Sequence, residues 1–238
     1  MTSITYQGAW QKIAQWTLAI SIPIVLVLSS VWILLNTAEW WVQIEYRLPG
    51  FPDDSYGFTL EDRLYWSMID IEYLLNDEGL DYFDDLRLED GSPMHNQREL
   101  RHMEDVKRLI HAVWMVLGIG LILSLILEVS LGILVNMRAA LEMLKRGTQN
   151  TLILVAILIL GVLIGFGVLF VGFHRIFFEG NTWIFQYSDT FIRLYPERFW
   201  RDTFVFLALI AATLGATVYI LSKLLLRRTR FQEDQGRS

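Results

Sequence analysis

The sequence predicts an all-α membrane protein with four transmembrane helices and a small, acidic, mostly helical extracytoplasmic domain between the first and second spans. The chain of 238 residues is 53% hydrophobic and has nine Trp, nine Tyr and fourteen Phe, which is too apolar for an average soluble domain. Four windows hold most of the apolar residues, and each is near or above the roughly 20 residues that a membrane-crossing helix needs. The windows are residues 13–35, 109–137, 151–173 and 203–222.

The first window is expected to be an uncleaved membrane anchor. Its apolar run is long for a signal peptide, only Lys12 precedes it as a positive charge, and the sequence that follows it is a poor cleavage site. Pro23 lies inside it, where neighbouring helices can tolerate a kink. Three of the windows carry no charged residue, and the second carries Glu128 near its inner end. Glu128 is expected to reach the interface or to pair with another helix.

The distribution of Lys and Arg predicts the orientation. Residues 1–12, 138–150 and 223–238 hold nine Lys and Arg among 41 residues, whereas residues 36–108 and 174–202 hold eleven among 102. The positive-inside rule therefore places both termini in the cytoplasm. The predicted order is a cytoplasmic N-terminus (1–12), span (13–35), extracytoplasmic domain (36–108), span (109–137), cytoplasmic loop (138–150), span (151–173), extracytoplasmic aromatic loop (174–202), span (203–222) and cytoplasmic tail (223–238).

The predicted outer domain is strongly acidic. Although the net charge of the whole chain is −6, residues 36–108 alone carry eighteen acidic and seven basic residues. The chain has no Cys, so it offers neither a disulfide nor a thiol nucleophile. It contains no dinucleotide-binding, P-loop, His-Glu-x-x-His or nucleophile-elbow motif. No nucleic-acid partner and no cofactor are expected.

Two helices are expected in this domain. In the first, Thr59 is a plausible N-cap with Asp62 reaching back, and apolar residues follow at helical spacing until residues 76–79 end it. This helix is expected to lie on the membrane surface or on the outer ends of the spans. Asn96 is a plausible cap for a second helix that continues through His102 into the second span.

All four histidines lie in the predicted outer segments or at the outer ends of spans. His102 and Asp105 are three residues apart on one helix face, so the carboxylate could orient the imidazole. His111 falls on the opposite side of that helix. His95 lies in a turn and is expected to be solvated, and His174 is embedded among aromatic residues.

If the helices are straight, His102 and His174 are expected to lie at different depths along the helix axis. If the second and third spans form a hairpin with matched inner ends at residues 136 and 151, His174 is level with Val113, and His102 lies about 16 Å further out. Three possibilities follow: the helix breaks or tilts near His102, the His174 segment continues outward, or the partner of His174 is His111. The residues alone do not choose between them.

Two motifs resemble those of a known family. "HMEDVK" (102–107) leads into a span, and "FHRIFFEGNTWIFQYSDTFIRLYPERFW" (173–200) follows one hairpin later. Together with "YGFTLEDRLYWSMIDIEYLLN" (56–76) and the order of the spans, they resemble the bacterial lipoprotein intramolecular transacylases, which are four-span membrane proteins.

The resemblance implies an enzyme at the outer face of the bacterial plasma membrane, among membrane lipids. It would move the sn-2 acyl chain of a diacylglyceryl-modified lipoprotein to the α-amino group of the N-terminal cysteine, giving an N-acyl, lyso-form lipoprotein. The two implicated catalytic histidines fall on His102 and His174, so the stretch around His102 would have to fold back toward the membrane. Asp105 is the candidate orienter of His102, and Asp189 or Arg193 would position the substrate or stabilise developing charge.

Two other functions remain open from the residues. One is a membrane ester hydrolase, with His102, His174, Asp105 and Asp189 as zinc ligands, although their spacing matches no metal signature and no metal is assigned. The other is a non-catalytic receptor or assembly factor whose acidic domain binds a partner. The sequence specifies neither which histidine is the base, nor the acyl-chain preference, nor the oligomeric state.

Overall fold

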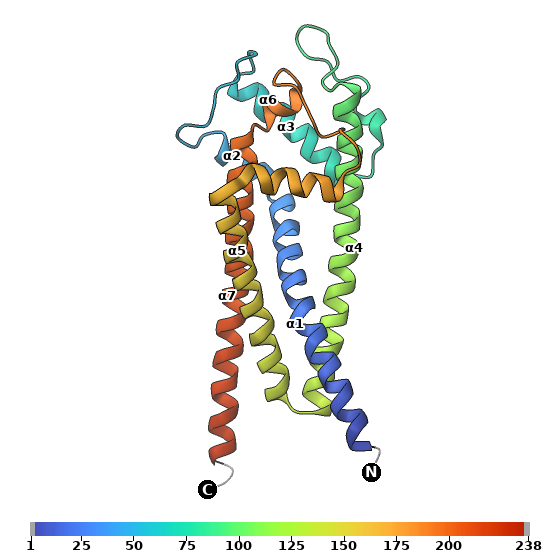
Figure 1. Cartoon of the computed structure of the whole chain (residues 1–238). Helices are drawn as coiled ribbons and strands as arrows, with labels where there is room; N and C mark the ends of the chain where they lie inside the picture. The colour runs from blue at the N-terminus through green and yellow to red at the C-terminus, as the bar shows by residue number, and fades with distance from the viewer. Residues whose placement is uncertain (1–2, 236–238) are drawn as a thin grey trace. The chain divides into compact units, whose positions relative to one another are not determined.

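The computed structural model describes residues 3–235, and the side chains of residues 8–229. Residues 1–2 and 236–238 of the predicted cytoplasmic termini lie outside the described residues. Within the described chain all regular elements are helical, apart from one isolated bridge between Arg87 and Pro93. The helices are α1 (Ser3–Asn36), α2 (Ala38–Glu45), α3 (Leu60–Leu75), the 3-10 helix η1 (Leu80–Phe83), α4 (Gln97–Leu134), α5 (Met137–Phe177), α6 (Thr190–Leu194) and α7 (Glu197–Gln235) (Figure 1).

Four of these helices are long and apolar enough to cross a membrane: α1, α4, α5 and α7. In the most apolar window of each, only 17–28% of the residues are buried inside the structure. Soluble proteins rarely expose apolar surface on this scale, whereas helices in contact with lipid do so over most of their length. The predicted all-α class with four membrane helices is therefore confirmed, while the sidedness of the acidic domain stays a prediction.

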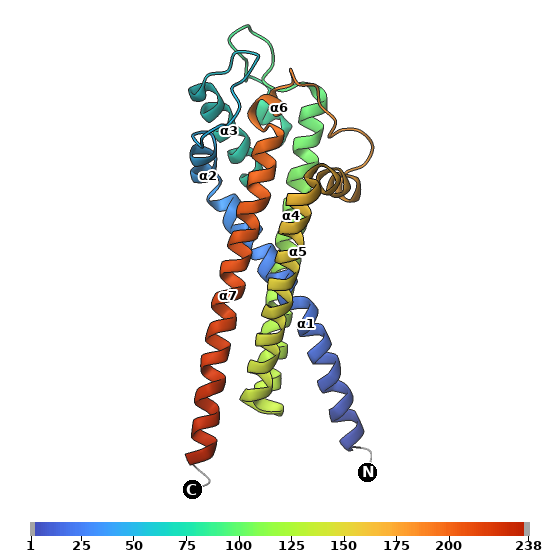
Figure 2. The same ribbon diagram turned by 60° about the vertical axis from the view of Figure 1, so that its left-hand side comes forward.

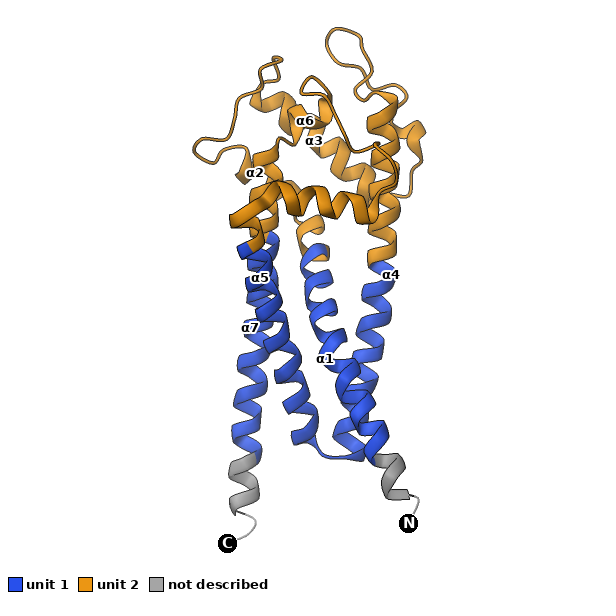
Figure 3. Cartoon of the chain, in the orientation of Figure 1, with its two compact units in different colours: residues 1–31, 114–160, 207–238 blue, residues 32–113, 161–206 orange. Residues whose placement is uncertain are grey.

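The chain divides into two compact units, which Figure 3 colours separately. Unit 1 contains residues 1–31, 114–160 and 207–238, and unit 2 contains residues 32–113 and 161–206. Every residue that the sequence analysis assigns to a site belongs to unit 2.

Unit 1 is held by small and apolar side chains of membrane helices. Its main cluster joins α1, α4 and α5. Two polar contacts add to it: Ser21 Oγ hydrogen-bonds Ser124 Oγ at 2.8 Å, and Asn150 Nδ2 donates to the Ala19 carbonyl at 3.1 Å. The buried members of the cluster are Ala14, Leu18, Ile22, Leu131, Ala140 and Met143.

The connection between α4 and α5 is much shorter than expected. Residues 138–150, which the sequence predicts to be a loop, are helical and belong to α5. The turn consists of Val135 and Asn136, and Asn136 Oδ1 accepts the backbone N–H of Ala139 at 2.8 Å. This side chain satisfies a free donor in the first turn of α5, so the helix can begin directly after the turn.

Unit 2 packs α2, α3 and α6 around the first turns of α4 and α7. Its cluster of buried apolar residues includes Tyr73, Met94, Met103 and Leu194. Two hydrogen bonds lie inside it: Tyr46 Oη donates to the Leu194 carbonyl at 2.9 Å and also hydrogen-bonds Ser67 Oγ at 2.6 Å. Unit 2 is therefore a folded layer with a core of its own.

Local capping explains where two of its helices begin. Thr59 caps α3 in a capping box, since its hydroxyl accepts the Asp62 N–H at 3.1 Å while Asp62 accepts the Thr59 N–H at 2.8 Å. Asn96 Oδ1 accepts the N–H groups of Arg98 and Glu99 at 2.9 and 3.1 Å and so caps α4. Both predicted caps are confirmed, and α4 continues without interruption through His102.

The bend that sequence analysis places near His102 lies in α5 instead. Gly165 has non-helical dihedral angles (φ −161°, ψ 59°) that divide α5 at a kink. Within unit 2, residues 166–177 contact both α4 and α7. Phe166 and Phe173 lie 5.9 and 6.2 Å from Phe204 of α7 between ring centroids. Figure 1 shows this segment running across from α7 to α4, and Figure 2 shows it end-on beside α4. The expectation that the chain around His102 folds back is therefore wrong.

We predict that Gly147→Ala destabilises the protein. A Cβ at Gly147 would lie 2.6 Å from the Cβ of buried Ile22, too close to be relieved by moving a flexible chain end. Close helix approach through small residues is a main source of cohesion between membrane helices. The temperature of unfolding in detergent should fall for this variant.

Gly118→Ala is the matched control, because nothing lies within 4 Å of a Cβ there. Ala is favoured over Gly inside a helix by ~1 kcal/mol, so this variant should unfold at the same or a higher temperature. Equal unfolding temperatures for the two variants would contradict the close approach of α1 and α5.

Candidate active site

His102 and His174 lie side by side in unit 2. His102 projects from the second turn of α4, and His174 from the last turn of α5 beyond the kink. Their rings are stacked, with centroids 5.9 Å apart and planes inclined by 25°. Both residues are buried, at 5% and 8% exposure. The structure thus brings together the two histidines that the family resemblance singles out.

Aromatic rings form the walls around the pair. Phe178, Phe185 and Phe191 meet the His102 ring edge-on at 4.8, 5.4 and 5.8 Å between centroids. Within the described residues, no carboxylate forms a hydrogen bond or ion pair with His102 or His174. An imidazolium in this place would therefore lack a counter-charge, and the two rings stand as neutral bases in an apolar setting.

One backbone contact defines the tautomer of His174. Its Nδ1 lies 2.8 Å from the Phe170 carbonyl oxygen, one turn earlier in α5. Because a carbonyl only accepts, Nδ1 must carry the proton, and Nε2 of the neutral ring then keeps its lone pair. His174 is thus arranged to accept a proton at Nε2. His102 has no such fixed partner, and its Nδ1 is buried without a hydrogen bond.

Asp105 does not orient His102. Its carboxylate forms an ion pair with Arg108 at 3.0 Å, on a partly exposed part of α4. His102 and Arg108 lie three residues to either side of Asp105, and the charged guanidinium takes the carboxylate.

Asp189 and Arg193 also lie in contacts of their own. Asp189 accepts from Arg98 Nη2 at 2.9 Å and from Asn96 Nδ2 at 3.1 Å, which ties the aromatic loop to the start of α4. Arg193 Nε donates to Asp54 Oδ2 at 3.0 Å, and its guanidinium lies over the Phe58 ring at 3.3 Å. Both side chains therefore hold loops in place.

The zinc-ligand set considered from the sequence is not assembled. In the part of the chain that the structure describes, no group of three or more His, Asp or Glu side chains could hold a metal ion. His102 and His174 meet, whereas Asp105 and Asp189 are paired elsewhere. His111 is exposed and makes no contact with His174, so its proposed pairing with His174 is wrong.

His95 is buried, contrary to the expectation that it is solvated. It is 3% exposed, and its Nε2 lies 2.8 Å from Asp70 Oδ1. Its Nδ1 lies 3.8 Å from Glu99 Oε1, and Asp70 Oδ2 also accepts from Tyr195 Oη at 3.1 Å. Burial by itself would lower the pKa of His95, but the charge and hydrogen bond of Asp70, together with Glu99, outweigh it and raise this pKa to about 9.

This buried charge cluster supports the wall of the histidine pair. Glu99 Oε1 accepts the backbone N–H of Phe191 at 2.7 Å. The Phe191 ring then lies between His95 and His102, at 5.3 and 5.8 Å from their centroids. Sequence reasoning missed Glu99 and Asp70; for Glu99 the available signal was the Asn96-x-x-Glu99 spacing of a capping box, in which Glu99 Oε2 accepts the Asn96 N–H at 2.7 Å.

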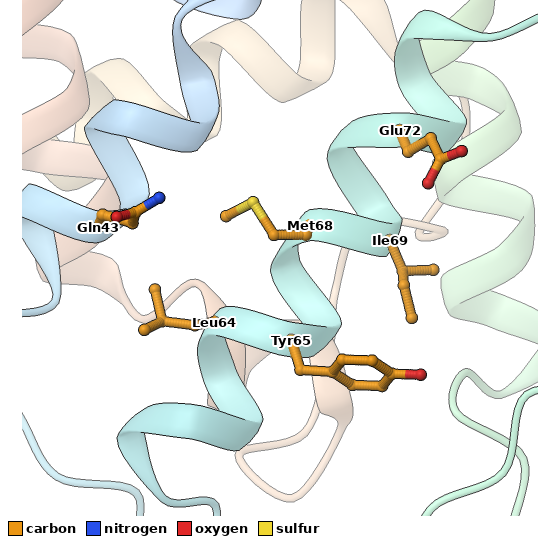
Figure 4. A pocket seen from close by; sticks show the side chains of 6 residues that line it. All are labelled: Gln43, Leu64, Tyr65, Met68, Ile69 and Glu72. Atoms are coloured by element: carbon orange, nitrogen blue, oxygen red, sulfur yellow. The ribbon is translucent and has the colours of Figure 1, made fainter.

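A pocket of about 410 Å³ lies elsewhere in unit 2, between α2 and α3. Figure 4 shows Leu64 and Met68 of α3 pointing toward Gln43 of α2. It has no histidine in its lining, and Glu72 is its single titratable acid. Two adjacent imidazoles are better suited to proton transfer than a single carboxylate, so we place the candidate site at the rings and not in this pocket.

The chain matches a protein family and several known proteins. Residues 16–200 match the model of the family described as lipoprotein intramolecular transacylase Lit. A protein from Aquifex aeolicus, described as uncharacterized, is 33% identical over 186 residues, which cover 76% of this chain and 81% of that protein.

Solved structures of the membrane-integral lipoprotein intramolecular transacylase Lit from Bacillus cereus share the fold. One has a TM-score of 0.78 at 21% identity and covers 94% of this chain and 99% of its own. A second, which carries a histidine-to-arginine substitution, has a TM-score of 0.77 at 20% identity and covers 96% and 97%. A third, which carries a histidine-to-alanine substitution, has a TM-score of 0.76 at 20% identity and covers 96% and 99%.

We predict that His95→Gln lowers stability in a pH-dependent way. The pKa of His95 is about 9 in the folded protein, against an ordinary value of 6.5. Its stabilising effect is therefore complete below about pH 6.5 and disappears as the pH rises through about 9. Removing one member of a buried charge cluster costs on the order of 3–5 kcal/mol.

Thermal unfolding of both proteins between about pH 6 and pH 10 measures this difference. The gap between wild type and His95→Gln should be widest near pH 6 and should close above pH 9. The exposed His111, changed to Gln, serves as the control and should follow the wild type throughout. A gap that stays constant with pH would show that His95 is not charged in the fold.

Proposed function

The chain belongs to the lipoprotein intramolecular transacylase family, and from this premise we propose how its two histidines carry out the transfer. The proposed reaction moves the sn-2 acyl chain of a diacylglyceryl-modified lipoprotein to the α-amino group of its N-terminal cysteine. The product is an N-acyl, lyso-form lipoprotein. The stacked pair His102 and His174 is the observation that carries the proposal.

The first task is to make the attacking amine neutral. An α-amino group has an ordinary pKa of ~7.7–8.0, so it is mainly protonated at neutral pH and must lose a proton before it can attack. We assign this proton to His102, which thereby becomes an imidazolium within the aromatic walls. A neutral imidazole next to the ammonium group suits this step because the positive charge only moves from one nitrogen to the other, so the site gains no additional charge.

The second proton leaves as the new bond forms. The amine nitrogen attacks the ester carbonyl carbon, and the nitrogen then gives up a proton to His174 Nε2. The hydrogen bond from Nδ1 to Phe170 supports this role, because it leaves Nε2 as the accepting nitrogen and stabilises the imidazolium that results.

Collapse of the tetrahedral adduct then breaks the bond to the glycerol oxygen. An alkoxide is a poor leaving group, and the imidazolium of His102 can supply its proton. Of the two protons lost by the ammonium group, one ends on the glycerol hydroxyl and the other leaves through His174 to solvent. Acid or base catalysis of each step typically contributes ~10²–10⁴-fold.

The enzyme needs no nucleophile of its own because the substrate supplies both reactants. Donor ester and acceptor amine belong to one molecule, and effective molarities for well-oriented intramolecular reactions reach ~10⁵–10⁸ M. The aromatic walls suit a lipid substrate and exclude water, which would otherwise hydrolyse the ester. We further propose that the site faces the outer side of the plasma membrane and that both termini are cytoplasmic, as the Lys and Arg distribution predicts.

We predict that His102→Ala and His174→Ala each abolish transfer, with losses of at least ~10²-fold. The measurement is mass spectrometry of the N-terminal peptide of a reporter lipoprotein produced with each variant. Wild type should give the N-acyl, lyso form, and both variants should leave the diacylglyceryl form. His111→Ala is the control and should behave as wild type.

Three outcomes would contradict the proposal. Transfer by either histidine variant would remove that residue from the mechanism. A lyso-form product without an N-acyl group would identify a hydrolase. An unmodified diacylglyceryl form with the wild-type protein would refute the proposed activity.

We also predict that Asp105→Asn keeps at least half of the wild-type activity, because Asp105 is paired with Arg108 and not with His102. The initial rate of transfer to a purified lipopeptide measures this. A loss comparable to that of His102→Ala would restore Asp105 as the orienter of His102.

A further inference from the structure

The chain reverses direction directly after His174. α5 ends at Phe177, the Phe178 N–H donates to the His174 carbonyl at 2.8 Å, and Gly180 adopts a positive φ of 65°. This conformation is readily available to glycine. The reversal returns Trp183 to the His174 ring, where the two centroids are 4.9 Å apart with planes inclined by 37°.

The indole N–H of Trp183 has no acceptor. Its Nε1 is buried and makes no hydrogen bond, and the same holds for the hydroxyl oxygen of the preceding Thr182. An indole nitrogen can only donate, and leaving a buried donor unpaired typically costs ~1–3 kcal/mol. A Phe would fill the same wall without that cost. Each such unpaired group in a native protein calls for an explanation, such as a catalytic role or a bound water or ion.

Two arginine side chains of the same unit already form ion pairs. Arg98 is paired with Asp189 at 2.9 Å, and Arg193 with Asp54 at 3.0 Å. His174 Nδ1 is held by the Phe170 carbonyl. Trp183 therefore offers a free N–H donor directly against the ring to which we assign the second proton transfer.

We propose that the Trp183 indole N–H binds the oxygen of the substrate's sn-2 ester carbonyl and stabilises the oxyanion that forms there. This inference rests on the proposed function. As the amine nitrogen bonds to the carbonyl carbon, the π pair of the C=O bond moves to oxygen, which becomes an anion hydrogen-bonded to Nε1. The C=O bond forms again when the glycerol C–O bond breaks, and the indole keeps its proton throughout. A neutral donor of this kind strengthens its hydrogen bond only as charge develops, which is what accelerates the step.

The first test is Trp183→Phe, which removes the N–H and keeps an aromatic ring. With a diacylglyceryl lipopeptide as substrate, kcat should fall ~10²–10³-fold, the typical cost of one oxyanion donor, while KM changes little. A phosphonate analogue of the sn-2 ester, which mimics the tetrahedral adduct, should lose affinity in parallel with kcat. Trp66→Phe removes an indole N–H from α3 in the same unit and should leave both quantities unchanged.

The second test does not depend on a Phe fitting the wall. Trp183→Ala leaves an apolar space beside the His174 ring, and apolar spaces of this kind bind small aromatic molecules. Added indole, which has the N–H, should restore activity at least tenfold better than added 1-methylindole, which fills the same space without a donor. Equal rescue by both compounds, or a Trp183→Phe variant with wild-type kcat, would overturn the proposal.

The outcomes separate this inference from the proposed function. If the wild-type protein forms no N-acyl product, the proposed function fails. If the wild-type protein and Trp183→Phe form the product at equal rates, the transfer stands and the role of Trp183 falls. Equal losses of affinity for the lipopeptide and for the phosphonate would mean that Trp183 only shapes the wall, which also contradicts the proposal.

Discussion

The bend of α5 at Gly165 sets the position of His174, and the histidine pair depends on it. His102 lies 32 residues before the last residue of α4, and the residue 32 positions after the first residue of α5 is Leu169. On two straight antiparallel helices, Leu169 would therefore be level with His102, and His174 would lie five residues further along α5. The kink instead directs residues 166–177 across unit 2, where His174 contacts α4 through His102 and Phe170 contacts Trp200 of α7 at 6.3 Å.

Charged side chains contact the residues that form the aromatic walls, and none of those described here contacts the two imidazoles. Glu99 holds the backbone of Phe191, and Asp189 holds the loop that carries Phe185. The carboxylates thus position the aromatic walls through backbone and cation contacts, while the two imidazoles contact only rings and one carbonyl. Because no buried counter-ion stabilises an imidazolium on either ring, any positive charge that forms there is unfavourable and short-lived.

Local signals predicted the elements well. The apolar windows gave the four membrane helices, and the caps at Thr59 and Asn96 gave the starts of α3 and α4, because capping depends on residues only two or three positions apart. The length of the hairpin turn was not predictable in this way. The positive charges at residues 138–150 suggested a loop between two spans. The segment is instead the first part of α5, capped by Asn136. Charged residues are compatible with either structure, so composition could not distinguish a loop from a helix that extends beyond the apolar span.

The site was predictable only where two motifs identified it. The family resemblance named His102 and His174, but their contact depends on the kink, which a single glycine in an apolar helix does not specify. Helix periodicity suggested Asp105 as the partner of His102, and Arg108 takes that carboxylate because it is equally near along the helix. His95 appeared solvated because its partner Asp70 comes from α3, 25 residues earlier, and a contact between residues so far apart is not visible in a local pattern.

The absence of a carboxylate from the histidine pair fits the chemistry required of it. In a catalytic triad, an acid stabilises an imidazolium because the enzyme must generate a strong nucleophile from a hydroxyl group. In the proposed reaction, the attacking amine is already nucleophilic once it is neutral, and the difficult part is to transfer two protons and stabilise one oxyanion in an apolar medium. In this proposal, two imidazoles without a carboxylate partner transfer the protons, and the neutral N–H of Trp183 suits the oxyanion better than a cation would. A fixed positive charge would also attract the leaving alkoxide and the carboxylates of nearby segments. A neutral donor stabilises only an oxygen within hydrogen-bond distance.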